Sequence, residues 1–169
     1  MENNRMVHGE SSPREYVKLG LVIAGITAIS WLLSSKAGSA GVLDYLRWFM
    51  GVFFVVFASF KLAGYRLFSM MFAGYDVVAK RFKPYSYAYP FIELALGVLY
   101  LADAVPIARD AATIAIMIIG SVGVVQEIKK RSGIHCACLG NVIKLPLSTV
   151  SLIEDAGMGL MALVMLLVR

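Results

Sequence analysis

Apolar residues along this chain are gathered into five runs of membrane-spanning length, separated by short polar segments. A helix that crosses a bilayer needs about 20 mostly apolar residues, within a range of about 17–25. The runs predict helices near 16–33, 45–65, 87–104, 107–126 and 152–168. Tyrosine and tryptophan lie near the ends of several runs, at the depth that amphipathic rings prefer. The pattern predicts an all-α integral membrane protein, with a tail over 1–15 and a single membrane domain over 16–169.

The segment at 66–83 is too short and too charged to cross a bilayer. Its apolar residues recur at helical spacing, with polar residues elsewhere around the helix: Leu67, Met71, Tyr75, Val78 and Phe82. Such a pattern is typical of an amphipathic helix that lies in the membrane interface. We expect one interfacial helix here, ended by Pro84, because the residue before a proline disfavours helical geometry.

Composition supports the membrane assignment. Hydrophobic residues make up 59% of the chain, charged residues 16%, and the mean hydropathy is +0.75. An average soluble domain is about 45–50% apolar and about 25% charged. A soluble enzyme, a disordered tail and a disulfide-rich secreted module are therefore poor fits. The formal net charge of +5 does not indicate a nucleic-acid partner, because the basic residues flank the membrane runs. The expected environment is the lipid bilayer.

The distribution of basic residues predicts orientation. Lysine and arginine are concentrated in the tail, in 66–83 and in the last loop at 129–146. By the positive-inside rule these segments face the cytoplasm, which predicts a multi-pass protein of the cell (inner) membrane. The first run has two interpretations. It is a retained anchor, favoured by its length and its long polar leader, or a signal-peptide core cleaved near Ser35–Ala37.

The loop at 129–146 carries the most unusual chemistry of the chain. The only two cysteines, Cys136 and Cys138, lie one residue apart beside His135. In an extended segment residues i and i+2 point to the same side, so both sulfurs can face one target. A disulfide between them would be strained and active in exchange, and the basic run at 129–131 favours the reactive thiolate form. As thiolates, the pair also suits Cu(I) or Hg(II), with His135 as a third ligand. The alternative is two ordinary cysteines in an interfacial loop.

Charged residues at membrane depth are a second signal. Lys61 and Glu93 lie within predicted spans at similar depth. Because an isolated charge at the bilayer centre costs at least about 2.5–3.5 kcal/mol, we predict an ion pair between them. Alternatively, Lys61 extends to the interface and Glu93 is protonated or bonded to another helix. Glu154 and Asp155 follow Ser151 in a capping-box pattern, and they are also placed to accept protons released by the thiols.

The last run also carries methionines at helical spacing, Met158, Met161 and Met165. Thioether sulfurs on one helix face suit passage of Cu(I), so these residues are weak candidates for metal ligands. Methionine is also ordinary flexible packing in a helical bundle, which is the simpler interpretation.

Three stretches of the chain stand out together: Phe60–Tyr75, the Tyr89–Gly97 stretch that contains Glu93, and the loop Cys136-Ala-Cys138-Leu-Gly140. In combination they resemble the MauE/DoxX group of small redox-associated membrane proteins. The loop is similar to the Cys-x-Cys-Phe-Gly element of methylamine-utilisation MauE proteins, with Leu139 in place of the aromatic residue. The resemblance covers about 48–169. It implies a four-helix core with a short interfacial helix, so the first helix is an addition. It also implies a supporting role in thiol–disulfide chemistry, in MauE for maturation of a periplasmic amine dehydrogenase.

Three functions follow from these observations. The first is a membrane thiol-redox partner, rather than an independent enzyme, in which Cys136 and Cys138 exchange with a thioredoxin-like or other cysteine-containing protein. The second is a soft-metal binding or transport protein that uses His135 and both cysteines. It is favoured by the predicted cytoplasmic placement, where disulfides are normally kept reduced. The third is a non-catalytic membrane assembly factor, for which the cysteines are dispensable.

Overall fold

The computed structural model describes residues 13–38, 41–130 and 149–168, and helices account for nearly all of them. The long helices follow from the apolar runs, because a helix satisfies its own backbone hydrogen bonds in a medium without water. In chain order the helices are α1 (Pro13–Lys36), α2 (Val42–Ala63), α3 (Tyr65–Tyr75), α4 (Val77–Arg81), α5 (Lys83–Leu101), α6 (Pro106–Lys130) and α7 (Thr149–Val168).

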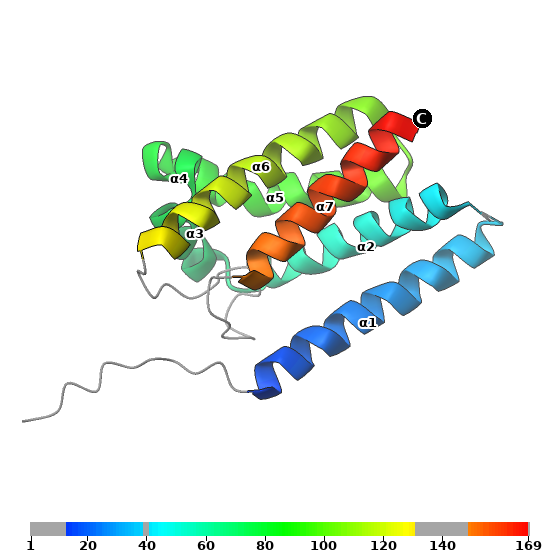
Figure 1. Cartoon of the computed structure of the whole chain (residues 1–169), viewed down its shortest axis with the longest axis horizontal. Helices are drawn as coiled ribbons and strands as arrows, with labels where there is room; N and C mark the ends of the chain where they lie inside the picture. The colour runs from blue at the N-terminus through cyan, green and yellow to red at the C-terminus, as the bar shows by residue number, and fades with distance from the viewer. Residues whose placement is uncertain (1–12, 39–40, 131–148, 169) are drawn as a thin grey trace, which may run out of the picture.

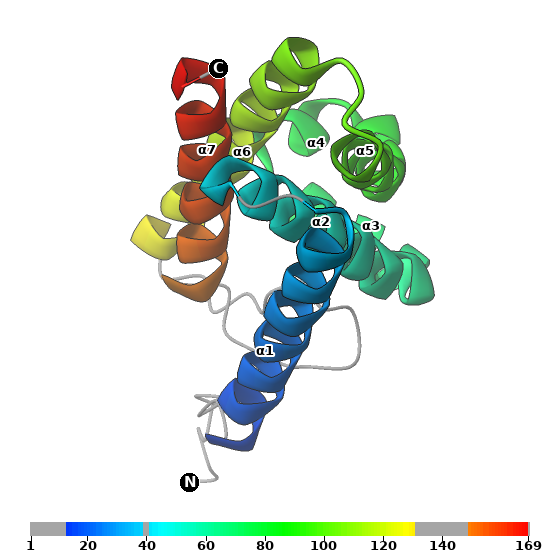
Figure 2. The same ribbon diagram turned by 90° about the vertical axis from the view of Figure 1, so that its right-hand side faces the viewer.

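The helices α2, α5, α6 and α7 form a bundle, and α1 lies along its side (Figure 1). Among the described helices α1 contacts α2 alone, and it diverges from the others when the molecule is turned (Figure 2). The most extensive contacts join α2 with α5 and α6 with α7. Buried residues between these pairs include Met50, Phe54, Phe57, Tyr100 and Met158.

Four of the described helices are long and apolar enough to cross a membrane by length and composition. These segments are Tyr16–Lys36, Val42–Ala63, Pro106–Lys129 and Ser151–Val168. The helix α5 is not among them, although the sequence predicts a span near 87–104. It carries a buried glutamate, Glu93, and an internal proline, Pro90, and it packs along α2. Contact with protein thus compensates for the polar residues that α5 contains.

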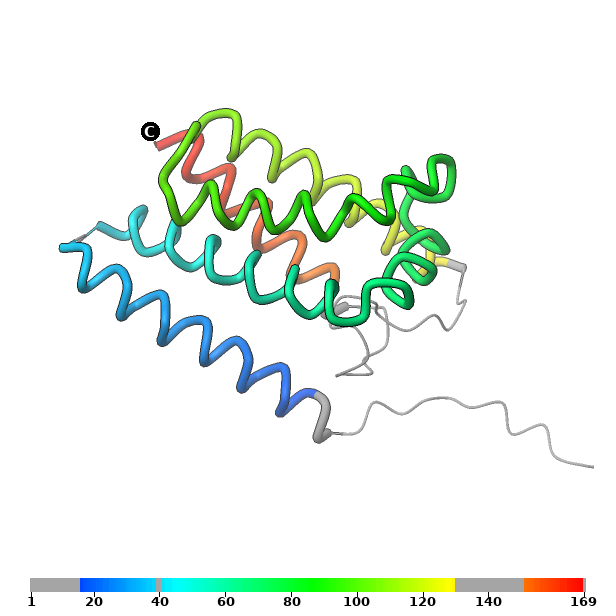
Figure 3. Tube along the Cα trace, turned by 180° about the vertical axis from the view of Figure 1, so that it is seen from behind, coloured from blue at the N-terminus to red at the C-terminus, as the bar shows by residue number. Residues whose placement is uncertain are grey.

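The segment expected to form one interfacial helix over 66–83 is instead an elbow of two helices, α3 and α4, at one end of the bundle (Figure 3). The break is at Asp76, whose Oδ1 accepts hydrogen bonds from the amides of Val78 at 2.9 Å and Ala79 at 2.8 Å. Asp76 therefore caps α4. Burial raises the pKa of the Asp76 carboxyl, and these two hydrogen bonds and Lys80 partly offset that effect.

The sequence predicts that Pro84 ends the interfacial helix. In the structure Pro84 instead lies in the first turn of α5. A proline fits this position because its missing N–H would have no partner within the first turn in any case. The chain thus turns back from the elbow into the bundle within a few residues, which places Ser86 and Tyr89 against α3 and its neighbours.

Glycines allow α2 and α5 to approach closely. A Cβ on Gly97 would lie 2.9 Å from Cγ2 of Val55 and 3.1 Å from the carbonyl oxygen of Gly51. A Cβ on Gly51 would lie 2.7 Å from the side chain of Leu101. By contrast, Gly20 of α1 has no atom within 4 Å of such a Cβ, so it does not mark a close contact with another helix. The close helix contact is made by glycines of α2 and α5.

Replacing Gly97 by alanine is expected to destabilise the protein by about 1–3 kcal/mol, because the new methyl group would meet backbone atoms that cannot rotate away. The matched control is Gly74→Ala in α3, where a Cβ would have no neighbour within 4 Å. Unfolding in mixed micelles measures both variants. Equal stability of the Gly97→Ala variant and the wild-type protein would contradict the close approach of the α2 and α5 backbones at Gly97.

Candidate functional site

The cysteine motif predicted from the sequence lies outside the described residues, as do His135, Cys136 and Cys138 themselves. The segment that carries them connects the end of α6 at Lys130 with the start of α7 at Thr149. Both helix ends lie at the elbow end of the bundle (Figure 1). The described site is therefore the group of side chains that this end of the bundle brings together.

An ion pair between Lys61 of α2 and Glu93 of α5 is the centre of this site. The Nζ of Lys61 donates hydrogen bonds to both carboxylate oxygens of Glu93. Lys61 is 5% exposed and Glu93 is 3% exposed. Lys61 is in the last turn of α2 and Glu93 is near the middle of α5, and both charges are buried where these two helices pack together. A buried charge in such a position needs a partner of opposite sign.

Two aromatic rings flank the ammonium group of Lys61. Its Nζ lies 5.0 Å from the ring centroid of Tyr89 and 5.6 Å from that of Phe68, within cation–π range. Tyr89 in turn packs on Phe72, with 4.3 Å between ring centroids. These contacts link the ion pair to the aromatic core of the elbow, so α3 fixes the position of the lysine.

A small cavity of about 20 Å³ adjoins the ion pair, which is enough volume for about one water molecule. Its lining includes Lys61, Tyr89, Gly120, Ser151 and Asp155, from four different helices. A Cβ on Gly120 would lie 2.9 Å from Oδ2 of Asp155, so the glycine makes room for this carboxylate. The start of α7 thus brings an acid to the same cavity as the lysine.

The helix α7 begins earlier than the capping-box interpretation requires. It starts at Thr149, and its first turn contains no acidic residue. Ser151, expected as the N-cap, is inside the helix, and Glu154 and Asp155 lie in the second turn. The capping box is therefore wrong. Asp155 instead lines the cavity beside Lys61.

The methionines of α7 are part of the core. Met158 is 2% exposed and Met165 is 5% exposed, and Met161 packs against the same cluster. No cluster of three or more histidine, cysteine, aspartate or glutamate side chains suited to a metal occurs within residues 13–38, 41–130 and 149–168. The metal ligands proposed from the sequence, His135 and the two cysteines, lie outside those ranges.

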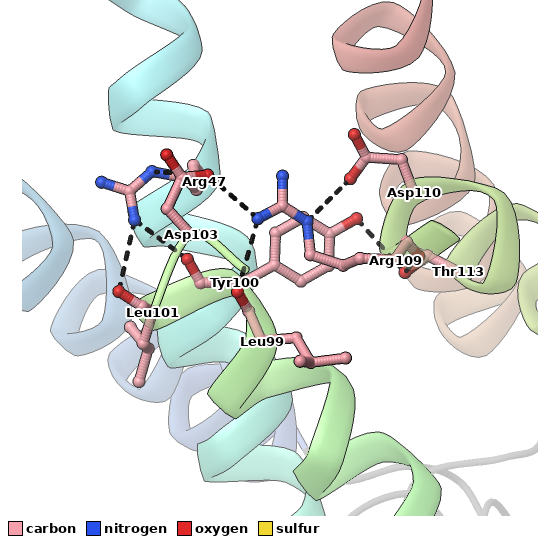
Figure 4. A network of polar contacts seen from close by, with 8 residues as sticks. All are labelled: Arg47, Leu99, Tyr100, Leu101, Asp103, Arg109, Asp110 and Thr113. Carbon is pink, nitrogen blue, oxygen red and sulfur yellow. Dashed lines mark hydrogen bonds and ion pairs between the residues drawn. The ribbon is translucent and has the colours of Figure 1, made fainter. Parts of the chain in front are cut away.

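A second polar network, at the opposite end of the bundle, was not predicted from the sequence (Figure 4). The guanidinium of Arg109 donates through Nε to Asp110 Oδ1 at 3.0 Å and through Nη1 to Asp103 Oδ1 at 3.2 Å. It also stacks over the ring of Tyr100, with 4.2 Å from Cζ to the ring centroid. The side chains of Arg109 and Asp110 are both completely buried. This network joins the end of α5 to the start of α6.

Arg47 extends the network to α2. Its Nη1 donates to the carbonyl oxygens of Tyr100 at 2.9 Å and Leu101 at 3.3 Å, and its Nε lies 3.8 Å from Asp103 Oδ1. Asp103 has a positive φ of 49°, a conformation that aspartate tolerates better than most residues. The sequence did contain a signal for this network. Arg47, Asp103 and Arg109 lie near the ends of three predicted runs, and the predicted topology places these ends on the same side of the membrane.

Comparison with known proteins gives one family. A family model described as "Methylamine utilisation protein MauE" matches residues 17–168. No curated protein and no solved structure matches the chain significantly. The match begins at residue 17 and so includes α1, whereas the resemblance seen in the sequence was expected to begin near residue 48. With several apolar helices and a match over nearly its whole length, this chain is a multi-pass membrane protein that belongs to the MauE family.

Proposed function

We propose that this protein supports thiol–disulfide chemistry at the membrane, with Cys136 and Cys138 as the exchanging thiols. The observation that carries the proposal is the buried Lys61–Glu93 pair beside a cavity that also contains Asp155. The cavity lies against the first turns of α7, and the cysteine segment leads directly into that helix. Membership of the MauE family supports the same role together with the sequence, because residues 136–140 resemble the Cys-x-Cys element of methylamine-utilisation MauE proteins.

The proposed reaction has two exchange steps. The thiolate of one cysteine attacks a disulfide sulfur of a thioredoxin-like or other cysteine-containing partner, and the partner's second sulfur leaves as a thiolate. The other cysteine of the pair then attacks the mixed disulfide. This step releases the partner as a dithiol and leaves a disulfide between Cys136 and Cys138. Two electrons pass to the partner, and the reverse sequence returns them.

The described residues have a proton-handling role in this proposal. Each cysteine must lose its proton to attack, and the leaving thiolates of the partner take up protons. Asp155 and Glu154 are acceptors near the start of α7, and Lys61 holds Glu93 as a charged partner in a site that excludes bulk water. The protein then acts as a redox partner rather than as an independent enzyme.

Soft-metal binding is the second candidate function, favoured by the charge of the elbow end. Exposed cations there, such as Arg81 and Lys83, suggest the cytoplasmic side by the positive-inside rule, and disulfides are normally reduced in that compartment. In this reading His135, Cys136 and Cys138 bind Cu(I) or Hg(II). A role as an assembly factor that needs neither cysteine is the remaining alternative.

Thiol trapping in cells distinguishes these functions. For the redox function, a Cys138→Ser variant is expected to accumulate a mixed disulfide that reductant releases, and the wild-type protein gains maleimide labelling after reduction. The Cys136→Ser, Cys138→Ser double variant is the control and gives neither signal. Full labelling of wild-type protein without reductant in every growth condition would overturn this function. Cu(I) binding that is lost on Cys136→Ser would then favour the metal function. Normal function of the double variant would favour the assembly role.

A further inference from the structure

The exposed charges of the elbow are all of one sign. On α3, on α4 and at the start of α5 the exposed charged side chains are Arg66, Lys80, Arg81 and Lys83. Two acids contact the elbow helices, Asp76 at the junction of α3 and α4 and Glu127 of α6, and they are 0% and 6% exposed. Asp76 caps α4, and Glu127 pairs with Lys80 at 2.7 Å. Folding thus buries the negative charges and leaves the positive ones at the surface.

Exposed apolar side chains alternate with these cations. Leu67 is 37% exposed, Met70 64% and Phe82 60%. Leu67 and Phe82 are adjacent in sequence to these cations, and Met70 lies four residues after Arg66. The opposite face of the elbow is buried in the aromatic cluster around Phe72. We call the six exposed side chains the elbow surface: Arg66, Leu67, Met70, Arg81, Phe82 and Lys83.

We infer that the elbow surface binds anionic phospholipid. Apolar groups between basic groups, on short helices at the end of a membrane bundle, fit the boundary between acyl chains and headgroups. Phe82, Met70 and Leu67 enter the acyl region, and the three cations contact lipid phosphates, which provide the missing negative charge. An acidic soluble partner would satisfy the cations but would leave these apolar side chains without a matching environment.

The tertiary structure separates these cations from the other basic residues of the same end. Lys80 is already paired with Glu127, so it contributes less to lipid binding than Arg81 or Lys83. Arginine forms paired hydrogen bonds to phosphate oxygens, so Arg66 and Arg81 are expected to contribute most. Removal of any one of Arg66, Arg81 and Lys83 is expected to lower lipid affinity about fivefold, and removal of all three by up to ~100-fold. The inference does not depend on the cysteines.

Lipid retention by the purified full-length protein tests the inference. The protein is titrated with phosphatidylglycerol or phosphatidylcholine in detergent, and native mass spectrometry counts the bound lipids. We expect phosphatidylglycerol to bind in excess over phosphatidylcholine in the wild-type protein. The excess should be lost in an Arg66→Gln, Arg81→Gln, Lys83→Gln variant and reduced in Arg81→Gln alone.

The matched control is Lys36→Gln, which removes an exposed cation at the opposite end of the bundle and should keep the excess. Thermal unfolding verifies that each variant is folded, and Arg81→Gln provides the comparison if the triple variant is not. An unchanged excess in Arg81→Gln and the triple variant would overturn the inference. Competition by inorganic phosphate at the lipid concentration would also overturn it, because free phosphate would then be the ligand.

Discussion

Replacing Glu93 by glutamine is expected to destabilise the protein by about 3–5 kcal/mol, because it removes the carboxylate that pairs with the buried ammonium of Lys61. Lys61→Met is expected to have a similar effect through the isolated carboxylate. The double variant Lys61→Met, Glu93→Leu should recover most of the lost stability, since a matched apolar pair in a buried site is often neutral or stabilising. The free energy of unfolding in mixed micelles gives the three values and their coupling.

The control for this cycle is Arg66→Gln, which removes an exposed cation close by in the chain and should change stability by less than about 0.5 kcal/mol. A Glu93→Gln variant as stable as Arg66→Gln would show that the pair contributes nothing to the fold. The double variant also separates structure from function. If the pair takes part in proton handling, thiol exchange slows in the double variant although the fold is retained. A purely structural pair predicts unchanged exchange.

The second large effect is expected at Arg109. Its guanidinium contacts Asp103, Asp110 and the carbonyl oxygen of Leu99, with no exposure of the side chain (Figure 4). Arg109→Met should destabilise the protein by about 3–5 kcal/mol, since Asp110 would remain fully buried without its cation. Arg109→Lys should recover little, because one ammonium group cannot reach the separate partners of Nε and Nη1.

Asp103→Asn is the control within the same network. The Asp103 side chain is 45% exposed, so loss of its charge is expected to matter by no more than about 1 kcal/mol. Asparagine also tolerates the positive φ of this position. Unfolding measurements compare the three variants. An Asp103→Asn variant as unstable as Arg109→Met, or a fully stable Arg109→Lys variant, would contradict this account of the network.

Local rules predicted the fold class and one tertiary contact. Run length and hydropathy identified the apolar helices, because spanning a bilayer requires a fixed length of apolar chain. The contact between Lys61 and Glu93 followed from the energy of an isolated charge at that depth, which allows few solutions other than a partner of opposite sign. Neither inference needs knowledge of how the helices are arranged.

Local rules were wrong where two signals competed in a short segment. The apolar spacing over 66–83 continues through Asp76, but this side chain prefers to cap a new helix and so divides the segment into α3 and α4. Likewise, the Ser151–Glu154 pattern matches a capping box, but α7 starts earlier, at Thr149. A helix boundary depends on small energy differences that neighbouring elements readily change.

The sequence by itself determined a helical membrane protein with two neighbouring cysteines, because these follow from composition and from positions along the chain, and it offered the Lys61–Glu93 ion pair as one of two alternatives. Only the tertiary structure decided that Asp155 shares a cavity with Lys61, that Arg47 and Arg109 meet Asp103, and that Lys80 of the elbow pairs with Glu127. The physical reason is that these contacts join different helices. The packing of the helices depends on the close approach of the α2 backbone at Gly97 and on the space that Gly120 leaves for the Asp155 carboxylate, which no single helix specifies.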